Sequence, residues 1–412
     1  MTCILRVDAC NLTACVDHLS GGSRPAWPFG CVPSSLHRSH KHGRGSKADS
    51  LNRRTAWPIL IVALLALVAA IALSPREHVF DENYYIKYVA LLHHHGLSMG
   101  LLELLPGATG PLYGVVHFAI EPLTGLDPVR MRLATFALLL VAIALVAVGL
   151  NLLEISEPWL TATAMVVVPM TWVLAGIALT GMPTLVFIAA NLVMQLRGLA
   201  ALDRGAAPMP WFIGAGALLG IAIAGRQTTS VLAVTPLLLP LIDRRLLAPV
   251  LVQAAIAALM ALPLLIAWGG PVPPLDDTEA GLAPENALLS LGYLLVGFLL
   301  LAKPPHWLLR WPCLLSGIAL LGLNAWLEIA VVFPLASIAD NFLSEPQMWA
   351  YGIVCGALLM WAGGAFLAWN AGETWRNRRD ARQVLVLSGL VALSLAPALI
   401  GNQFSSRYAA MA

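Results

Sequence analysis

Apolar residues in this 412-residue chain come in long uninterrupted runs, without the alternation that marks a half-buried β-strand. A helix needs about 20 mostly apolar residues to cross a bilayer, and about eleven runs approach that length. The pattern therefore predicts an all-α fold, a polytopic transmembrane helical bundle. The predicted spans are residues 57–73, 133–150, 159–177, 183–199, 211–224, 230–242, 246–268, 287–302, 311–333, 348–369 and 384–400.

Composition agrees with this pattern, since 59% of the residues are hydrophobic and only 11% are charged. The net charge of +2 is small and no basic cluster is interleaved with aromatic residues, which excludes a nucleic-acid partner. Four of the 6 cysteines lie in the first 31 residues without a metal-ligand spacing, so neither a disulfide nor a zinc site is predicted.

The chain divides into two parts by composition. Residues 1–56 are polar and rich in Gly, Ser, His and Arg, and they read as a disordered cytoplasmic tail or as a wrongly assigned start. Residues 57–412 read as one transmembrane domain with a long first outer loop at 75–130. Within that loop, residues 110–125 form an apolar segment that is too short to span and is interrupted by Glu121 and Pro122, which predicts an interfacial helix.

The distribution of Lys and Arg supports an interfacial position for that helix. An interfacial helix at 110–125 places 18 of the 24 basic residues on one side of the membrane and 6 on the other, whereas a true span there would divide them equally. Because basic residues favour the cytoplasmic side, the loop at 75–130 is predicted to be extracytoplasmic.

That loop opens with the stretch "FDENYYIKYVALLHHH", residues 80–95. Helical spacing from Asp81 places Tyr85, Tyr88, Leu92 and His95 on one face. A carboxylate at a helix N-terminus is suited both to capping the helix and to acting as a general base, and the spacing leaves both roles open.

Four short motifs resemble a known family, the dolichyl-phosphate-glucose-dependent alpha-1,2-glucosyltransferases of the GT-C glycosyltransferase superfamily. They are "FDENYY" at 80–85, "GPLYG" at 110–114, "MRLATF" at 131–136 and "GRQTTS" at 225–230, in the family's order. The family's Gln-rich continuation is absent after the first motif, and the Ala-, Leu- and Arg-rich composition looks bacterial. The resemblance therefore implies a GT-C transmembrane domain that moves a hexose from a polyprenyl-phosphate donor to a hydroxyl acceptor with inversion.

The chemistry of sugar transfer suggests roles for individual residues. The resemblance implies that Asp81 is the base for the acceptor proton, and Glu82 is expected to orient the acceptor. Arg226 is the expected phosphate ligand, because its planar guanidinium matches phosphate oxygens, and Gln227 is expected to contact a sugar hydroxyl. The further substrate-binding candidates are Lys87, Tyr85, His95, Tyr113, Arg407 and Tyr408.

Other polar groups are weaker candidates. His93, His94 and His95 are consecutive, so on a helix they cannot converge on one ion, and interfacial polar residues are the favoured reading. Asp276 and Asp277 fit a solvated loop, with a substrate or divalent-metal role left open, and Glu328 lies near the outer end of a predicted span.

The sequence therefore predicts a hexosyltransferase of the bacterial inner membrane with its active site facing the periplasm. Its partners would be membrane lipids, a polyprenyl-phosphate sugar as donor, and a glycan, lipid or protein acceptor. A multi-span transporter or flippase of a lipid-linked or small polar substrate is the alternative.

Overall fold

In the computed structural model, the chain is described over residues 47–79, 81–105, 109–271, 282–301, 311–331, 342–376 and 378–399. These residues form helices and their connections, and no β-strand occurs among them. The predicted all-α class is therefore confirmed. Each of the eleven predicted apolar segments falls mainly on helical residues where it is described, although the helix in segment 311–333 ends at Leu327 and residues 328–331 are not helical.

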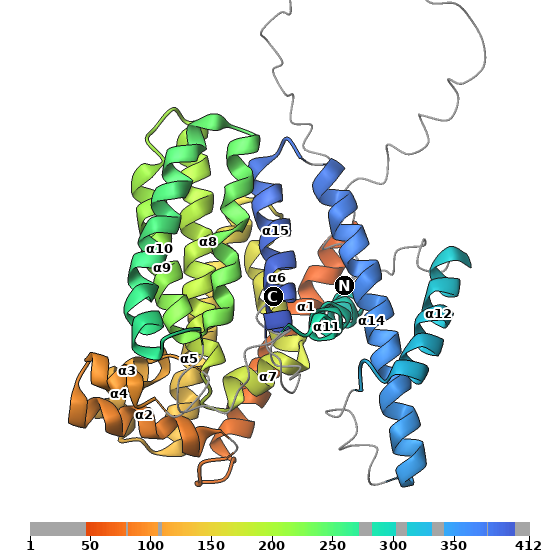
Figure 1. Ribbon diagram of the computed structural model, residues 1–412, viewed down its shortest axis with the longest axis horizontal. Coiled ribbons are helices and arrows are strands. Elements are labelled where there is room, and N and C mark those ends of the chain that lie inside the picture. Colours follow the sequence, from red (N-terminus) through yellow and green to blue (C-terminus); the bar gives the residue numbers. More distant parts are fainter. Residues whose placement is uncertain are drawn as a thin grey trace, which may run out of the picture.

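The largest group of helices forms a bundle whose members run side by side (Figure 1). Its middle is tightly packed because glycines let two helices approach each other closely. A Cβ on Gly216 would lie 2.6 Å from the Gln253 carbonyl oxygen, and one on Gly220 would lie 2.6 Å from Met260 Cβ. Such small residues four apart are typical of helix contacts in membranes. The members are α5 (Pro128–Leu152), α8 (Gly181–Asp203), α9 (Met209–Gly225), η3 (Gln227–Ala233), η4 (Thr235–Leu241), α10 (Leu247–Trp268) and α15 (Ala381–Leu395), which continues into η7 (Ala396–Leu399).

Two further groups pack on this bundle. Helix α1 (Lys47–Ala72) contacts α5 and the broken segment formed by α6 (Pro158–Thr163), η2 (Ala164–Val167) and α7 (Pro169–Gly176). The other group consists of α11 (Pro284–Leu301), α12 (Trp311–Leu327) and α14 (Glu345–Arg376). Helix α11 crosses α14 so closely that a Cβ on Gly292 would lie 2.2 Å from the Leu359 carbonyl oxygen.

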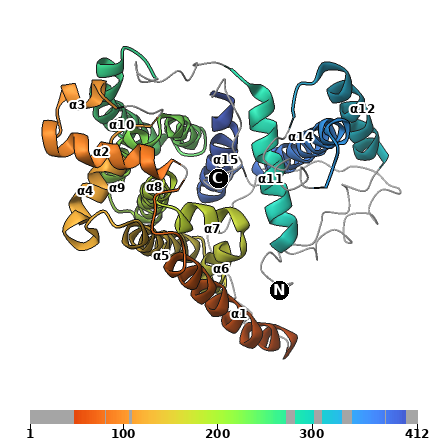
Figure 2. The same ribbon diagram turned by 90° about the horizontal axis from the view of Figure 1, so that it is seen from below.

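The helices differ in whether they could cross a membrane. Among the described residues, five helices are long and apolar enough to do so, or six if the bent α6–α7 pair is one span. Four more apolar helices have 10–17 residues, namely 56–72, 209–225, 227–241 and 311–327. Helix α11, which the sequence assigns to a span, runs across the direction of α8, α9 and α10 in both ribbon views (Figures 1 and 2).

A separate layer of short helices lies across the lower end of the bundle (Figures 1 and 2). It consists of α2 (Glu82–His95), α3 (Met99–Glu103) and α4 (Leu112–Thr124). The 13 residues of α4 extend only about 20 Å, less than the thickness of a bilayer core. The short segment at 110–125 is therefore a helix lying across the bundle, as the sequence predicts.

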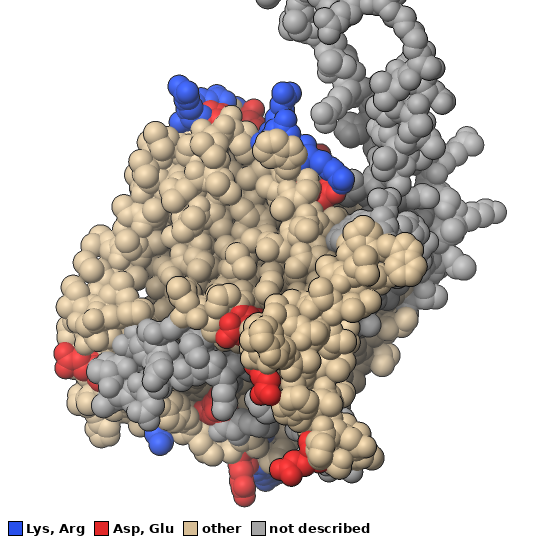
Figure 3. Space-filling view, turned by 45° about the vertical axis from the view of Figure 1, so that its right-hand side comes forward, with Lys and Arg blue, Asp and Glu red and all other residues tan. Residues whose placement is uncertain are grey.

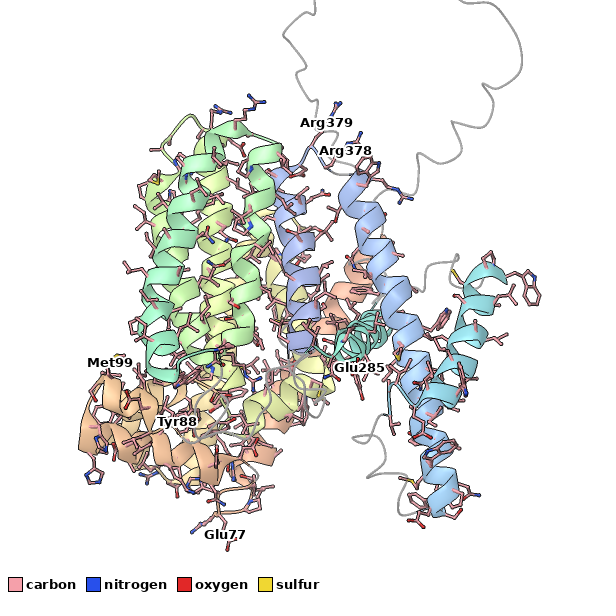
Figure 4. All side chains as sticks on the ribbon, in the orientation of Figure 1. Glu77, Tyr88, Met99, Glu285, Arg378 and Arg379 are labelled. Carbon is pink, nitrogen blue, oxygen red and sulfur yellow. The ribbon has the colours of Figure 1, made fainter. Side chains whose placement is uncertain are left out.

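The two ends of the bundle carry charged residues of opposite sign. Lys and Arg gather at the end opposite α2 and α4, whereas Asp and Glu predominate at the other end (Figure 3). Arg382, at the start of α15, pairs with Asp203 at the end of α8, so the loops assigned to the cytoplasmic side lie together. Arg378 and Arg379 lie at this same end, and Glu77 and Met99 lie at the opposite one (Figure 4).

Surface labelling tests which end faces out. In a cysteine-free background, we expect an impermeant maleimide added to intact cells to label Leu97→Cys, because Leu97 is 72% exposed beside α3. Arg378→Cys, at the basic end, should react only after the membrane is permeabilised. Equal labelling of both variants in intact cells would contradict this topology.

Candidate functional site

The four sequence motifs converge at the lower end of the bundle, although about 150 residues separate the first from the last. Glu82 of the first motif pairs with Arg132 of the third. The rings of Tyr85 and Tyr113 bring the first motif against the second, with centroids 5.5 Å apart. A Cβ on Gly110 would lie 2.2 Å from the Ala224 carbonyl oxygen, directly before the fourth motif. Tyr88 marks this region in Figure 4.

A buried ion pair joins α2 to α5. Glu82 is 0% exposed and Arg132 is 1% exposed. Arg132 donates from Nε to Glu82 Oε1 at 2.9 Å and from Nη2 to Oε2 at 2.6 Å. Such a bidentate pair fixes both distance and orientation.

The ion pair also holds the chain on either side of it. Arg132 donates further hydrogen bonds to the Ser74 hydroxyl and to the carbonyls of Pro75 and Glu77. Glu82 accepts from the backbone N–H of Val79 at 2.9 Å and of Ala178 at 2.8 Å. Burial opposes ionisation of the Glu82 carboxyl, but the hydrogen bonds from Arg132 and the two backbone groups outweigh it and hold its pKa below the ordinary value.

Asp81 lies directly before α2, at the edge of this buried network. It is half-buried, and its side chain makes no capping hydrogen bond to the helix. The backbone carbonyl of Asp81 accepts the first hydrogen bond of the helix, from the Tyr85 N–H at 2.9 Å. Of the two roles that the sequence leaves open for Asp81, helix capping by its carboxylate is therefore absent.

Arg226 lies at the end of α9, close to the same network. Its side chain is 6% exposed, and Nη2 donates to the Thr180 hydroxyl at 3.2 Å. Thr180 is two residues from Ala178, whose N–H binds Glu82, and two residues of chain span at most about 7 Å. One short turn between α7 and α8 thus holds both Glu82 and Arg226. Gln227 follows Arg226 and is half-buried.

An aromatic cluster fills the space between α2 and α4. The Tyr85 ring is also 5.5 Å from the Tyr88 ring, and the Tyr113 ring is 4.3 Å from the His117 imidazole. Tyr88 donates its hydroxyl to the Thr109 carbonyl at 3.2 Å. Of the face predicted for α2, Tyr85, Tyr88 and Leu92 are buried, whereas His95 is exposed.

Several polar atoms in this cluster lack a hydrogen-bond partner among the described residues. They are the hydroxyls of Thr109 and Tyr113 and both ring nitrogens of His117. A buried polar group without a partner costs about 1–3 kcal/mol. Burial lowers the pKa of His117 to about 4, and the charge of Glu82 offsets this only in part. Burial, followed by the charge of Glu82, raises the pKa of Tyr113.

Three other candidate residues lie apart from this convergence. Lys87 is exposed on α2 and lies 5.8 Å from the Tyr84 ring centroid. His95 ends the same helix, about 20 Å from Asp81 along its axis. Glu328 is exposed after α12, away from α2 and α4. The remaining predicted residues lie outside the described residues: Arg407, Tyr408, Asp276 and Asp277.

Of the three histidines at the end of α2, His93 contacts α4. His93 Nε2 lies 2.6 Å from Glu121 Oε2 of α4, and its ring contacts Phe118. Within the described part of the chain, no group of three His, Cys, Asp or Glu side chains is placed to hold a metal ion. Both Glu82 oxygens are engaged by Arg132 and backbone N–H groups, so this carboxylate does not fit a metal-ligand role here.

Sequence reasoning missed three parts of the site. The sequence assigns no role to Arg132 itself, although it lies within the "MRLATF" motif. His117 and the turn at Ala178 and Thr180 carry no signal in the sequence, because their importance depends on contacts between residues up to 96 positions apart.

The chain is similar to two solved structures at low sequence identity. No protein-family model and no curated protein matches the chain. The crystal structure of ArnT from Cupriavidus metallidurans in the apo state is 16% identical, with a TM-score of 0.41 over 84% of this chain and 77% of that one. The structure of the same protein bound to undecaprenyl phosphate is 14% identical, with a TM-score of 0.40 over 86% and 77%. Similarity at this level does not transfer an activity.

Proposed function

We propose that this protein is a GT-C-type glycosyltransferase that moves a hexose from a polyprenyl-phosphate donor to a hydroxyl acceptor. The observation that carries the proposal is the convergence of four motifs at one end of an apolar helical bundle. There, Asp81, which does not cap α2, lies directly before Glu82 of the buried ion pair. The turn between α7 and α8 binds both Glu82 and the buried Arg226. Transfer from a lipid-linked sugar requires a base for the acceptor proton and a cation for the departing phosphate, which Asp81 and Arg226 would supply.

The proposed reaction is a single displacement. Asp81 takes the proton of the acceptor hydroxyl as its oxygen forms a bond to the anomeric carbon. The bond from that carbon to the phosphate oxygen breaks on the opposite face, so the sugar configuration inverts. The electron pair leaves with the lipid phosphate, and the guanidinium of Arg226 stabilises the resulting charge.

In this mechanism Glu82 is a positioning residue. The sequence predicts that it orients the acceptor, whereas its oxygens are occupied by Arg132, Val79 and Ala178. A fully buried carboxylate held in this way fixes the first turn of α2. It thereby fixes the direction of the neighbouring Asp81, which catalysis requires to be placed within fractions of an ångström.

Transfer of label tests the proposed function. Membranes containing the protein are incubated with radiolabelled polyprenyl-phosphate sugars, and the label is followed into new products. We expect covalent transfer to a hydroxyl-bearing acceptor, with release of polyprenyl phosphate. Movement of intact donor across the membrane without a new product would instead indicate the flippase alternative. If neither transfer nor movement is observed, both functions are ruled out.

Arg226→Ala tests the donor-phosphate contact. Loss of a hydrogen bond to a charged group costs about 1.5–3 kcal/mol, so KM for the donor should rise about tenfold to a hundredfold. KM for the acceptor should change much less. Arg130→Ala is the matched control, since Arg130 is an exposed arginine at the start of α5. An effect confined to the acceptor would remove the phosphate role of Arg226.

A further inference from the structure

We propose that Thr109, Tyr113 and His117 form a subsite that binds hydroxyl groups of a sugar ring. This inference rests on the proposed function and deepens it. The three residues belong to one segment that leads into α4 and continues along it, and none of them is among the groups that the proposed reaction uses directly.

The evidence for a ligand is the set of buried polar atoms. The exposed fractions of Thr109, Tyr113 and His117 are 5%, 1% and 0%. Their hydroxyls and both imidazole nitrogens have no hydrogen-bond partner among the described residues. Folded proteins rarely leave such buried groups unpaired, so a bound ligand is expected to supply their hydrogen bonds.

The three residues all lie at the aromatic cluster between α2 and α4. Tyr113 and His117 are four residues apart on α4 and therefore project from the same face, with ring centroids 4.3 Å apart. The Thr109 carbonyl is bound by Tyr88 of α2, which fixes Thr109 against the same aromatic cluster.

The chemistry of these groups favours a neutral hydroxyl. The hydroxyls of Thr and Tyr both donate and accept hydrogen bonds, and a neutral imidazole has one nitrogen of each kind. A sugar hydroxyl also does both. A phosphate offers only acceptors and is best matched by a cation, and none of the three residues carries a positive charge at neutral pH, since burial keeps His117 neutral.

The position relative to Asp81 agrees with a sugar site. Tyr85 begins the second turn of α2, its N–H binds the Asp81 carbonyl, and its ring contacts Tyr113. A ring bound beside Tyr113 would therefore lie next to the proposed base. Helix α4 packs tightly on α2 here, since a Cβ on Gly114 would lie 2.9 Å from Tyr88 Cβ.

Monodeoxy substrates test the subsite. In one arm, kcat/KM is measured for polyprenyl-phosphate glucose and each of its monodeoxy forms as donors. In the other arm, octyl glucoside and its monodeoxy forms are the acceptors. We expect the wild type to discriminate about tenfold or more against one deoxy form in one arm. Tyr113→Phe and His117→Phe should lose that discrimination, and the arm in which this happens identifies the sugar that binds.

Stability measurements separate binding from a structural role. Because Tyr113→Phe removes a buried hydroxyl that has no described partner, its thermal midpoint should equal or exceed that of the wild type. Tyr351→Phe, in α14, is the matched control and should keep the wild-type discrimination. Wild-type discrimination in both variants and both arms would overturn the subsite while the proposed function stands, and a lower midpoint would then assign the Tyr113 hydroxyl a structural role. If the wild type transfers no sugar from any donor, the proposed function fails and the subsite falls with it.

Discussion

Asp81→Asn abolishes sugar transfer if Asp81 is the base, while the protein still inserts and folds. The substitution keeps the size of the side chain and removes its ability to take a proton. General base catalysis contributes about a hundredfold to ten-thousandfold to a rate, so we expect kcat to fall by that factor. Because Asn has nearly the same shape as Asp and the residue is only half-buried, the substitution should change stability little. Initial rates of transfer and a thermal melt in detergent measure the two effects.

Glu77→Gln is the matched control for Asp81→Asn. Glu77 is an exposed carboxylate four residues earlier, and only its backbone carbonyl contacts the ion pair. Its substitution should leave both rate and stability near the wild-type values. Near-normal transfer by Asp81→Asn would contradict the mechanism, and equal losses in the two variants would indicate a general effect of negative charge at this surface.

Local composition was sufficient to predict the long α-helices of the bundle. The apolar runs at 133–150, 183–199 and 246–268 correspond to α5, α8 and α10, whose ends lie within a few residues of the predicted limits. The same principle identified α4, because Glu121 and Pro122 limit its apolar length. These features depend on residues close together in sequence, which hydrophobic patterning records directly.

The direction of a helix depends on its neighbours and was not predictable. The run at 287–302 is as apolar as a span, yet α11 lies across the bundle helices (Figure 2). Its packing is set by a close crossing with α14, in which a Cβ on Gly363 would lie 2.1 Å from the Leu288 carbonyl oxygen. Hydropathy describes how apolar a segment is but not what it packs against.

The candidate site shows the same division. Its motifs were visible in the sequence, and so was the buried face of α2. The partner of Glu82 was not, because Arg132 lies 50 residues away and differs little in sequence context from the exposed Arg130. An acidic pair in a loop also gives no sign of which carboxylate is buried. Only the tertiary contacts separate Asp81, at the surface, from Glu82, inside the network.

Glu82→Gln should be the most destabilising conservative change in this region. It keeps the shape of the side chain but leaves the Arg132 guanidinium buried without its counter-charge. Removing one partner of a buried ion pair typically costs about 3–5 kcal/mol. Transfer should fall as well, because the first turn of α2 holds Asp81. The free energy of unfolding in detergent, measured by denaturant titration, gives the magnitude.

The pH dependence of stability provides a check that is specific to the charge of Glu82. Since folding lowers the pKa of this carboxyl from its ordinary value of 4.5, the ionised group stabilises the folded protein above that pH. This contribution is lost as the pH falls through the lower pKa of the folded state. Wild-type stability should therefore decline below about pH 4.5 more steeply than that of Glu82→Gln. Parallel acid profiles for the two proteins would show that the Glu82 charge adds nothing to stability.

The double variant Glu82→Leu/Arg132→Met separates the ion pair from the other contacts of Arg132. With both charges removed, no unpaired charge stays buried. Because a broken buried pair costs about 3–5 kcal/mol, the double variant should be more stable than Glu82→Gln by more than about 1 kcal/mol. It should stay below the wild type, because the carbonyls of Pro75 and Glu77 lose the hydrogen bonds from Arg132. If the losses of stability in Glu82→Leu alone and Arg132→Met alone add up to the loss in the double variant, Arg132 acts on the 74–79 segment independently of Glu82. Coupled losses would make the pair the connection that sets the position of Asp81 between α2 and α5.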